Sequence, residues 1–276
     1  PATRAPSYSC AMNLPKPTAF ITGAGRGIGR LTAEKLLDRG WTVGVYDITD
    51  DVSWADGHDR AITGRLDVRD PGQWESALAD FAERAAGLYL LVNNAGVLYG
   101  SAFADADYAA DERIIDVNVK GVIYGARAAL PYLRESRGQL VNVASAAAIY
   151  GTPDMAVYSA SKFAVRGFTE ALEYEWRELG IRVASVWPLF TDTGMLDGVE
   201  TTGTKRLGVR LTPAYVAGKI VDCIEDGLAD KPRSPAKVHY PVGAQATVLK
   251  AGSHMSPPFL TRFVNGKLTT KRKIGF

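Results

Sequence analysis

The sequence predicts an α/β protein with one doubly wound parallel sheet, covered by helices on both faces, in a single domain. Short apolar runs typical of buried strands alternate along the chain with longer amphipathic stretches. A glycine-rich turn joins the first of these strands to the first helix. Because crossovers between parallel strands are right-handed, this alternation places ligand-binding loops at the carboxyl ends of the strands.

The expected elements follow one another from residue 18 to residue 227. The strands are expected at Thr18–Ile21, Thr42–Tyr46, Ile62–Leu66, Tyr89–Val92, Gln139–Val143 and Arg182–Trp187. Helices are expected at 28–38, 71–85, 109–134 and 157–179, and Pro213 begins a last one at Ala214–Gly227. The segment 189–212 is long and rich in glycine, and we interpret it as a lid over the strand ends.

A tyrosine and a lysine four residues apart carry the clearest chemical signal. Tyr158 and Lys162 lie one turn apart on one face of the expected helix 157–179. A free phenol titrates near pH ~10, and a nearby ammonium stabilises the phenolate and lowers the pKa of the tyrosine. We therefore predict that this pair transfers a proton. The alternative is an ordinary pair on a helix surface.

The glycine-rich turn predicts a nucleotide site. It runs from Thr22 to Gly29, between the first expected strand and the first expected helix. Such a turn lets the backbone approach a pyrophosphate, which the helix N-terminus attracts. Asp47 ends the second expected strand, about 20 residues farther on, where a carboxylate can bind the adenosine ribose and repel a 2′-phosphate. This favours NAD, although Arg26 suits NADP, which remains the alternative.

Composition narrows the class of protein. The chain is 46% apolar and 22% charged, as in ordinary globular proteins, and its net charge of +2 gives no reason to expect a nucleic-acid partner. Cys10 and Cys223 allow no disulfide framework, which favours the cytoplasm. The three histidines show no metal-ligand spacing, so no metal is expected. No apolar run approaches the ~18 residues of a transmembrane span.

With its motifs in this order, the chain resembles the short-chain dehydrogenase/reductase family, of the shorter single-domain type, over roughly residues 17 to 227. Further motifs carry the resemblance: Leu66-Asp67-Val68, Asn93-Asn94-Ala95-Gly96, Asp116-Val117-Asn118-Val119, and Ser145 thirteen residues before Tyr158. The resemblance implies a Rossmann-type fold. It also implies that a nicotinamide cofactor exchanges a hydride with an alcohol or its ketone.

The resemblance also implies a site, residue by residue. Four residues would form the catalytic relay: Tyr158 moves the proton, Ser145 orients the substrate, Lys162 holds the ribose and lowers the pKa of Tyr158, and Asn118 links Lys162 to water. The cofactor would contact Thr22, Gly23, Arg26, Gly27, Ile28, Gly29, Asp47, Asp67, Val68, Asn94, Ala95, Gly96, Tyr158, Lys162, Pro188, Thr191 and Thr193. The substrate would contact Ser145, Tyr150, Leu189, Phe190 and Met195.

The residues after the sixth expected strand depart from the family pattern. The family commonly has Pro-Gly there, whereas this chain has Pro188-Leu189-Phe190. The bulky pair predicts an apolar pocket, and we expect the substrate to be a small apolar secondary alcohol or its ketone. Other candidate walls are Leu98, Tyr99, Ala147, Ile149 and Leu196. A dinucleotide-binding regulatory protein without turnover is the alternative, which the complete relay disfavours.

The sequence also gives expectations for the two ends of the chain and for its assembly. Residues 1–16 are expected to form a disordered leader, 17–250 the Rossmann-fold catalytic domain, and 251–276 a C-terminal extension. Its basic end, Lys271-Arg272-Lys273, is interpreted as a solvated tail, with weak contact to an anionic membrane surface as the alternative. Apolar residues on helices 109–134 and 157–179, which pair across a two-fold axis in the family, predict a homo-oligomer. We find no C-terminal strand with paired glycines, and therefore expect a dimer.

Overall fold

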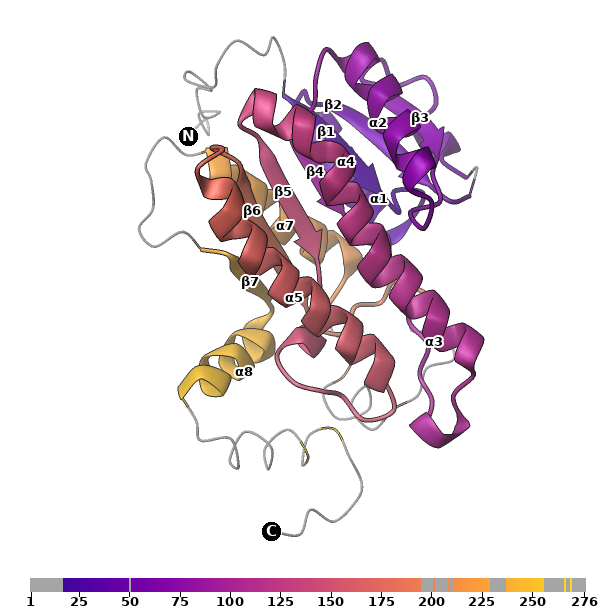
Figure 1. Ribbon diagram of the computed structural model, residues 1–276, viewed down its shortest axis with the longest axis vertical. Coiled ribbons are helices and arrows are strands. Elements are labelled where there is room, and N and C mark those ends of the chain that lie inside the picture. Colours follow the sequence, from indigo (N-terminus) through magenta and orange to yellow (C-terminus); the bar gives the residue numbers. More distant parts are fainter. Residues whose placement is uncertain are drawn as a thin grey trace, which may run out of the picture.

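The centre of the molecule is a seven-stranded parallel sheet with the strand order β3-β2-β1-β4-β5-β6-β7 (Figure 1). The computed structural model describes residues 17–49, 51–194, 201, 208, 211–228, 237–255, 266 and 269. Its strands are β1 (Thr18–Thr22), β2 (Thr42–Asp47), β3 (Ala61–Arg65), β4 (Leu90–Asn93), β5 (Gln139–Val143), β6 (Arg182–Pro188) and β7 (His239–Val242). The predicted doubly wound fold is confirmed.

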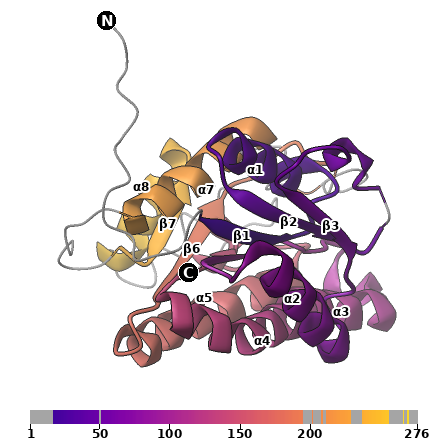
Figure 2. The same ribbon diagram turned by 90° about the horizontal axis from the view of Figure 1, so that it is seen from above.

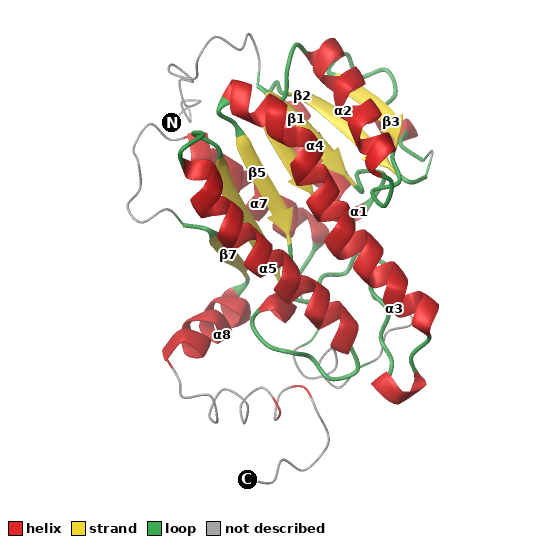
Figure 3. Ribbon diagram, in the orientation of Figure 1, coloured by secondary structure: helices red, strands yellow, loops and turns green. Residues whose placement is uncertain are grey.

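Helices cover both faces of this sheet (Figures 2 and 3). They are α1 (Gly27–Asp38), α2 (Pro71–Ala85), α3 (Tyr108–Ile115), α4 (Gly121–Ser136), α5 (Ala156–Arg177), α7 (Pro213–Leu228) and α8 (Ala244–Met255). α1 packs against α7 on one face, and α2 packs against α4 on the other, where α5 also lies. The sheet therefore has a hydrophobic core on each side.

Burial on both faces explains why the central strands consist mainly of apolar residues. Every residue of β1 is buried. One core lies between the sheet and the pair α1 and α7 and includes Leu36 and Ile220. The other lies between the sheet and α2, α4 and α5 and includes Phe81, Leu133 and Trp176. Both cores fix the sheet, so the loops at its edge start from a rigid frame.

The strand order reverses between β1 and β4. These two strands are neighbours in the sheet although β2 and β3 lie between them in the chain. Loops that leave the carboxyl ends of β1 and β4 therefore turn to opposite faces and leave a crevice between them. The glycine-rich turn follows β1 on one side of this crevice, and the Asn94–Gly96 segment follows β4 on the other.

The expected helix 109–134 is in fact two helices with a π-helical segment, Asp116–Lys120, between them. There the Gly121 N–H bonds to the Asp116 carbonyl, five residues back instead of four. The sequence shows no proline or glycine inside this segment, so nothing in the local pattern predicts the extra residue. Such segments occur often at functional sites.

The structure has a seventh strand that we did not expect, although it carries no paired glycines. β7 pairs in parallel with β6, from Ser185 opposite His239 to Pro188 opposite Val242. We missed it because it has only four residues and contains Pro241, which lacks a backbone N–H. β7 lies at the edge of the sheet, where a proline is tolerated. α8 then runs across the expected boundary between residues 250 and 251.

Three other expectations lie wholly or mainly outside the described residues. These are the leader 1–16, the basic end of the chain, and most of the expected lid 189–212. The described part of the lid includes Thr191, which forms an isolated parallel bridge with Leu211.

Candidate functional site

A cavity of ≈ 610 Å³ opens at the carboxyl ends of the strands, at the point where the strand order reverses. The expected site residues that line it are Gly23, Arg26, Gly27, Ile28, Asp47, Asp67, Val68, Asn94, Ala95, Gly96, Ser145, Tyr158, Lys162, Pro188, Leu189, Phe190, Thr191 and Thr193. The expected residues Thr22, Gly29, Asn118 and Tyr150 do not line it, nor do the candidate wall residues Tyr99, Ala147 and Ile149. Met195 and Leu196 lie outside the described residues.

Thr22 and Asn94 tie the glycine-rich turn to the loop after β4. The Thr22 Oγ1 accepts hydrogen bonds from the backbone N–H groups of Asn94 and Ala95, each at 3.1 Å. In return, the Asn94 Nδ2 donates to the carbonyls of Thr22 at 2.9 Å and Gly23 at 3.0 Å. Thr22 is buried, so its role is to brace the turn from behind the cavity.

The N-terminus of α1 suits an anionic group such as a pyrophosphate. Its N-cap residue, Arg26, has no capping hydrogen bond from its side chain, and the first turn has no acidic residue. The first backbone N–H groups of a helix have no partner within the helix, and they carry its positive dipole end. Gly27 has a φ of +59°, which few residues other than glycine adopt, and it lines the cavity.

Gly29 is required for the approach of α1 to the turn. A Cβ at this position would lie 2.2 Å from the Gly23 carbonyl oxygen and 2.5 Å from Asn94 Nδ2. No real atom fits at these distances, so only glycine allows the helix to start so close to the turn. Gly29 thus shapes the phosphate cradle without contributing to the cavity surface.

Asp47 lies at the cavity and already binds backbone groups there. Its Oδ2 accepts a hydrogen bond from the Gly25 N–H at 2.9 Å, and its Oδ1 accepts one from the Thr49 N–H at 3.3 Å. The carboxylate therefore links the end of β2 to the glycine-rich turn. Arg26, which would favour a 2′-phosphate, lines the same cavity as Asp47, which would repel one.

Two arginines that we did not expect join Asp67 at the cavity. Arg69 Nε donates to Asp67 Oδ1 at 2.9 Å, and this hydrogen bond holds the pKa of Asp67 below its ordinary value. Arg113, in α3, also lines the cavity. Arg69 could have been found from its position two residues after Asp67. Arg113 had no such signal, because it belongs to none of the motifs that indicate the site.

Ser145, Tyr158 and Lys162 lie together at the other end of the cavity. Tyr158 is in the first turn of α5, which places Lys162 one turn later on the same face. The Lys162 Nζ lies 5.5 Å from the centroid of the Tyr158 ring and donates a hydrogen bond to the Val143 carbonyl at 3.2 Å. The Ser145 Oγ accepts from the Ala147 N–H at 3.1 Å, which fixes the serine at the end of β5.

The pKa values of this pair differ from our expectation. We expected the ammonium of Lys162 to lower the pKa of Tyr158. Instead burial raises the pKa of Tyr158 to about 12, although a hydrogen bond with Ser145 opposes this. Burial also lowers the pKa of Lys162 to about 8. Both groups lose water, which disfavours both charged forms, and this cost outweighs their mutual attraction. Tyr158 therefore keeps its proton at neutral pH.

Asn118 supports the site from within the π-helical segment. Its Oδ1 accepts from the Val97 N–H at 2.9 Å, and its Nδ2 donates to the Val97 carbonyl at 2.9 Å and to Ser161 Oγ at 3.2 Å. A Cβ at Gly96 would lie 3.3 Å from Asn118 Oδ1 and 3.8 Å from Lys162 Nζ. Asn118 is therefore close to the lysine, and its side chain holds the loop that lies between them.

Apolar side chains surround the hydroxyl end of the site. Leu98, Met155 and Ala147 form a buried cluster with Tyr158, and Phe190 packs against it. Leu98, Leu189 and Phe190 line the cavity, as we expected. Tyr99 is 41% exposed and does not line it. Tyr150 packs with Ile149 and Leu189 in the neighbouring cluster, so the structure does not bring its side chain to the cavity surface.

The described part of the chain contains neither a candidate metal site nor a helix that could span a membrane. Its residues include no group of three or more His, Cys, Asp or Glu side chains that could hold a metal ion. None of the helices there has the length and apolar character to cross a membrane.

Residues 17–203 match the sequence profile of the family described as short chain dehydrogenase. The 3-alpha-(or 20-beta)-hydroxysteroid dehydrogenase of Mycobacterium tuberculosis is 35% identical over 213 residues, which cover 75% of this chain and 82% of the relative. The L-2,3-butanediol dehydrogenase of Corynebacterium glutamicum is 34% identical over 197 residues, which cover 68% of this chain and 76% of that relative.

A solved structure shares the whole architecture. The crystal structure of a short chain dehydrogenase from Burkholderia cenocepacia in complex with NADP superimposes with a TM-score of 0.76 at 27% identity. The match covers 94% of this chain and 100% of that chain.

Proposed function

Because this chain belongs to the short-chain dehydrogenase/reductase family, we propose that it interconverts an apolar secondary alcohol and its ketone with NAD or NADP as cofactor. One observation carries the proposal. A single cavity joins the N-terminus of α1, which suits a pyrophosphate, to Ser145, Tyr158 and Lys162, which suit a carbonyl group and its proton. A protein that only bound a dinucleotide would not need this second group of residues.

The residues that would hold the dinucleotide come from the ends of β1, β2, β3, β4 and β6 and from α5. The glycine-rich turn would bind the pyrophosphate, Asp47 the adenosine ribose, and Asp67 with Val68 the adenine. Lys162 would bind the other ribose, and Pro188, Thr191 and Thr193 the nicotinamide. All but Gly29 and Thr22 of the expected cofactor residues line the cavity, which supports this assignment. The nicotinamide, when bound, supplies or accepts the hydride.

The protein's part in the reaction is to hold the substrate oxygen and move its proton. In reduction, the Tyr158 hydroxyl donates its proton to the carbonyl oxygen, and Ser145 Oγ donates a hydrogen bond to the same oxygen. The high pKa of Tyr158 keeps this proton in place at neutral pH. The charge of Lys162, half of which is lost at its pKa of about 8, stabilises the phenolate that remains. We propose that Asn118 completes the path by which the proton is replaced.

The apolar surroundings support a hydrophobic substrate. Leu98, Leu189 and Phe190 line the cavity next to Tyr158. The hydroxysteroid relative fits this reading, whereas the butanediol relative acts on a small, more polar compound, so the family alone does not decide between them. The bulky pair Leu189-Phe190, which follows the proline where the family commonly has glycine, favours the hydrophobic substrate.

A screen of alcohols and ketones tests the proposed function, with turnover monitored by the fluorescence of NADH and NADPH. We expect turnover of cyclic and long-chain hydrophobic secondary alcohols or their ketones, with 2,3-butanediol as the polar comparison. The expected order of kcat/KM places the hydrophobic compounds first, because they bury more apolar surface against Leu98 and Phe190. Activity restricted to short polyols or charged sugars would refute the substrate assignment.

The preference between the two cofactors forms a separate prediction. We expect NADH to bind more tightly than NADPH, because the carboxylate of Asp47 would repel the 2′-phosphate. Asp47→Asn keeps an oxygen that accepts from Gly25 but removes the charge, so it should narrow the difference in Kd. Asp47→Ala also removes the bond to the turn and should weaken both cofactors. Fluorescence titrations measure the Kd of both cofactors for all three proteins, and tighter NADPH binding by the wild type would show that Arg26 dominates.

The assembly and the location of the protein remain our proposals. We propose a homodimer through α4 and α5, located in the cytoplasm. The exposed Phe163 and Tyr174 on α5 support such a surface, since they are 40% and 70% exposed.

A further inference from the structure

A chain of hydrogen-bonded polar groups, most of them buried, lies behind residues 188–190 of the cavity wall, and the proposed mechanism uses none of them. Ser185 in β6 lies opposite His239 in β7, and its Oγ is 2.8 Å from His239 Nδ1. The other ring nitrogen, Nε2, is 2.8 Å from Glu170 Oε1 in α5. Trp187 Nε1 donates to Ser185 Oγ, also at 2.8 Å. Ser185 and Trp187 are completely buried, and His239 is 9% exposed.

The chemistry of these groups determines which atom donates and which accepts in each of these hydrogen bonds. An indole N–H can only donate, so Ser185 Oγ accepts from Trp187 and has its own hydrogen left to donate. The ionised carboxylate of Glu170 can only accept, so the hydrogen of a neutral imidazole lies on Nε2, and Nδ1 accepts from Ser185 Oγ. That hydrogen is donated to the carboxylate of Glu170. Burial lowers the pKa of His239 to about 4, although Glu170 opposes this, so the neutral ring is the form present at neutral pH.

Charged side chains from two helices complete the surroundings of His239. Arg166 Nε donates to Glu170 Oε1 at 2.9 Å, and these hydrogen bonds, from Arg166 and His239, lower the pKa of Glu170 against the effect of its burial. Lys250 in α8 donates to the His239 carbonyl at 3.1 Å. The carboxylate therefore remains charged at neutral pH and provides a strong acceptor at the end of the chain.

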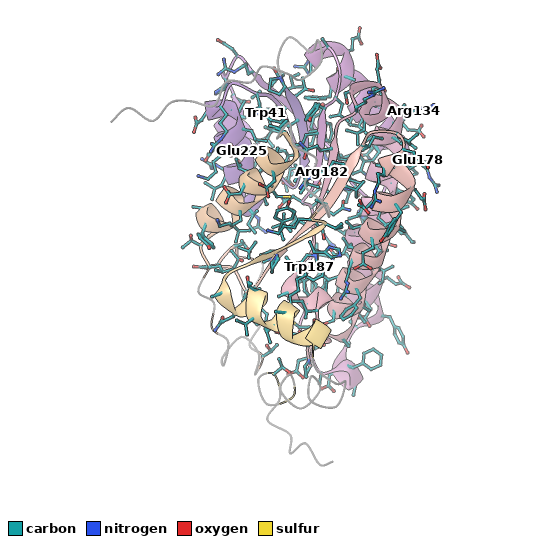
Figure 4. The ribbon with its side chains drawn as sticks, turned by 90° about the vertical axis from the view of Figure 1, so that its left-hand side faces the viewer. Trp41, Arg134, Glu178, Arg182, Trp187 and Glu225 are labelled. Carbon is teal, nitrogen blue, oxygen red and sulfur yellow. The ribbon has the colours of Figure 1, made fainter. Side chains whose placement is uncertain are left out.

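Trp187 is held on its face as well as at its edge. Its ring is stacked on His239 with the centroids 4.3 Å apart and the planes at 29°. The guanidinium of Arg166 lies 5.3 Å and the ammonium of Lys250 lies 5.4 Å from the centroid of the indole. In Figure 4, Trp187 lies beside α8, at the end of β6 remote from Arg182. Elements from three parts of the chain thus converge on one side chain.

Trp187 directly precedes residues that form the wall of the cavity. These residues are Pro188, Leu189 and Phe190. The Pro188 carbonyl accepts from Ser145 Oγ at 3.4 Å, and Trp187 packs in one buried cluster with Leu189. Arg166 reaches the other side of the site, where its Nη1 donates to the Ala148 carbonyl at 3.3 Å, three residues after Ser145. A shift of Trp187 would therefore move the substrate wall.

We infer that the Ser185–His239–Glu170 chain is a positioning device that fixes Trp187, and through it the 188–190 wall, so that β7 and α8 determine how tightly substrate binds. The inference rests on the proposed function for its effect on the substrate. None of these residues touches the cavity, so they act through Trp187 and not on the reacting atoms. The expected effect is therefore on substrate affinity and wall mobility, and not on the proton transfer itself.

The protein provides a matched control in the next residue of β7. Tyr240 is as buried as His239, and its hydroxyl accepts from Arg182 Nη2 at 2.8 Å. Arg182 begins β6, at the end of the strand remote from the cavity. Tyr240→Phe and Ser185→Ala each delete one buried hydroxyl that joins β6 and β7. Only Ser185→Ala breaks the chain that leads to Trp187.

Hydrogen exchange and steady-state kinetics on the full chain test the inference. For Ser185→Ala we expect amides in peptides covering 187–193 to exchange about tenfold faster, because Trp187 Nε1 and His239 Nδ1 both lose a buried partner. We expect KM for the best hydrophobic substrate to rise by about the same factor, with kcat and the Kd of NADH within about threefold of the wild type. Tyr240→Phe should change neither the exchange nor KM, even if it lowers Tm.

The possible outcomes separate the inference from the proposed function. Equal amide exchange rates in 187–193 for Ser185→Ala and the wild type would overturn the inference. The hydrogen bonds of Ser185, His239 and Glu170 would then have only a structural role. If the wild type turns over no alcohol or ketone, the proposed function fails, while the exchange comparison still decides whether the chain holds the wall. Glu170→Gln, at a partly exposed position, gives a second variant should Ser185→Ala not fold; it should increase exchange less, because a neutral amide oxygen still accepts from His239.

Discussion

Replacement of Tyr158 by phenylalanine is expected to lower turnover by about 10²–10⁴-fold while the affinity for NADH stays close to that of the wild type. The change removes only the hydroxyl that donates the proton. The ring stays, and its packing with Leu98 and Met155 does not depend on the oxygen. The glycine-rich turn and Asp47, which would hold most of the dinucleotide, lie at the other end of the cavity and are untouched.

Single-turnover rates and fluorescence titration of NADH measure the two quantities separately. Tyr46→Phe is the matched control, because Tyr46 is also a buried tyrosine whose pKa burial raises to about 12. It packs on Phe20 beneath α2, away from the cavity, so its loss of a hydroxyl should leave turnover within about threefold. If Tyr158→Phe kept a similar fraction of the wild-type rate, the phenol would not be the proton donor.

A single methyl group at Gly29 is expected to abolish tight binding of NADH and to lower the free energy of unfolding by about 1–3 kcal/mol. The new Cβ would lie 2.2 Å from the Gly23 carbonyl oxygen, which is backbone and cannot rotate away. Relief of the clash requires the start of α1 to move from the turn. That movement separates the backbone N–H groups that we assign to the pyrophosphate.

Gly218→Ala in α7 gives the control for this substitution. A Cβ at Gly218 would meet no atom within 4 Å, and alanine is favoured over glycine inside a helix by about 1 kcal/mol. Urea unfolding should therefore show equal or higher stability for this variant, with the Kd of NADH unchanged. A Gly29→Ala protein with wild-type affinity would show that α1 can withdraw without disturbing the phosphate cradle.

The sequence was sufficient wherever a function depends on a short local pattern. The glycine-rich turn, Asp47 and the Tyr158/Lys162 pair could be located because each is fixed by a strand end or by one helical turn. Strand pairing between residues far apart in the sequence has no comparable local pattern. β7 has four residues and a proline, and it becomes a strand only because β6 offers it an edge.

Electrostatics set a second limit on the sequence analysis. Proximity of Tyr158 and Lys162 correctly predicted two groups on one helix face, but the sign of each pKa shift depends on how far both are buried. Burial is a property of the packed site, to which Leu98 and Met155 contribute from other elements. Arg113 illustrates the same point, because it lines the cavity only once α3 has packed against α5 in the folded protein.

In the π-helical segment between α3 and α4, the number of residues matters more for the structure than their identity. Each helical residue advances the chain by about 100°, so the extra residue in Asp116–Lys120 offsets the inward face of α3 from that of α4 by that angle. Loss of one residue would give a regular helix but would swing Ile114, which packs in the cluster with Tyr158, toward a different neighbour. Relatives that diverge here should therefore exchange exposed side chains such as Lys120 freely and yet keep the residue count between Ile114 and Gly121 unchanged.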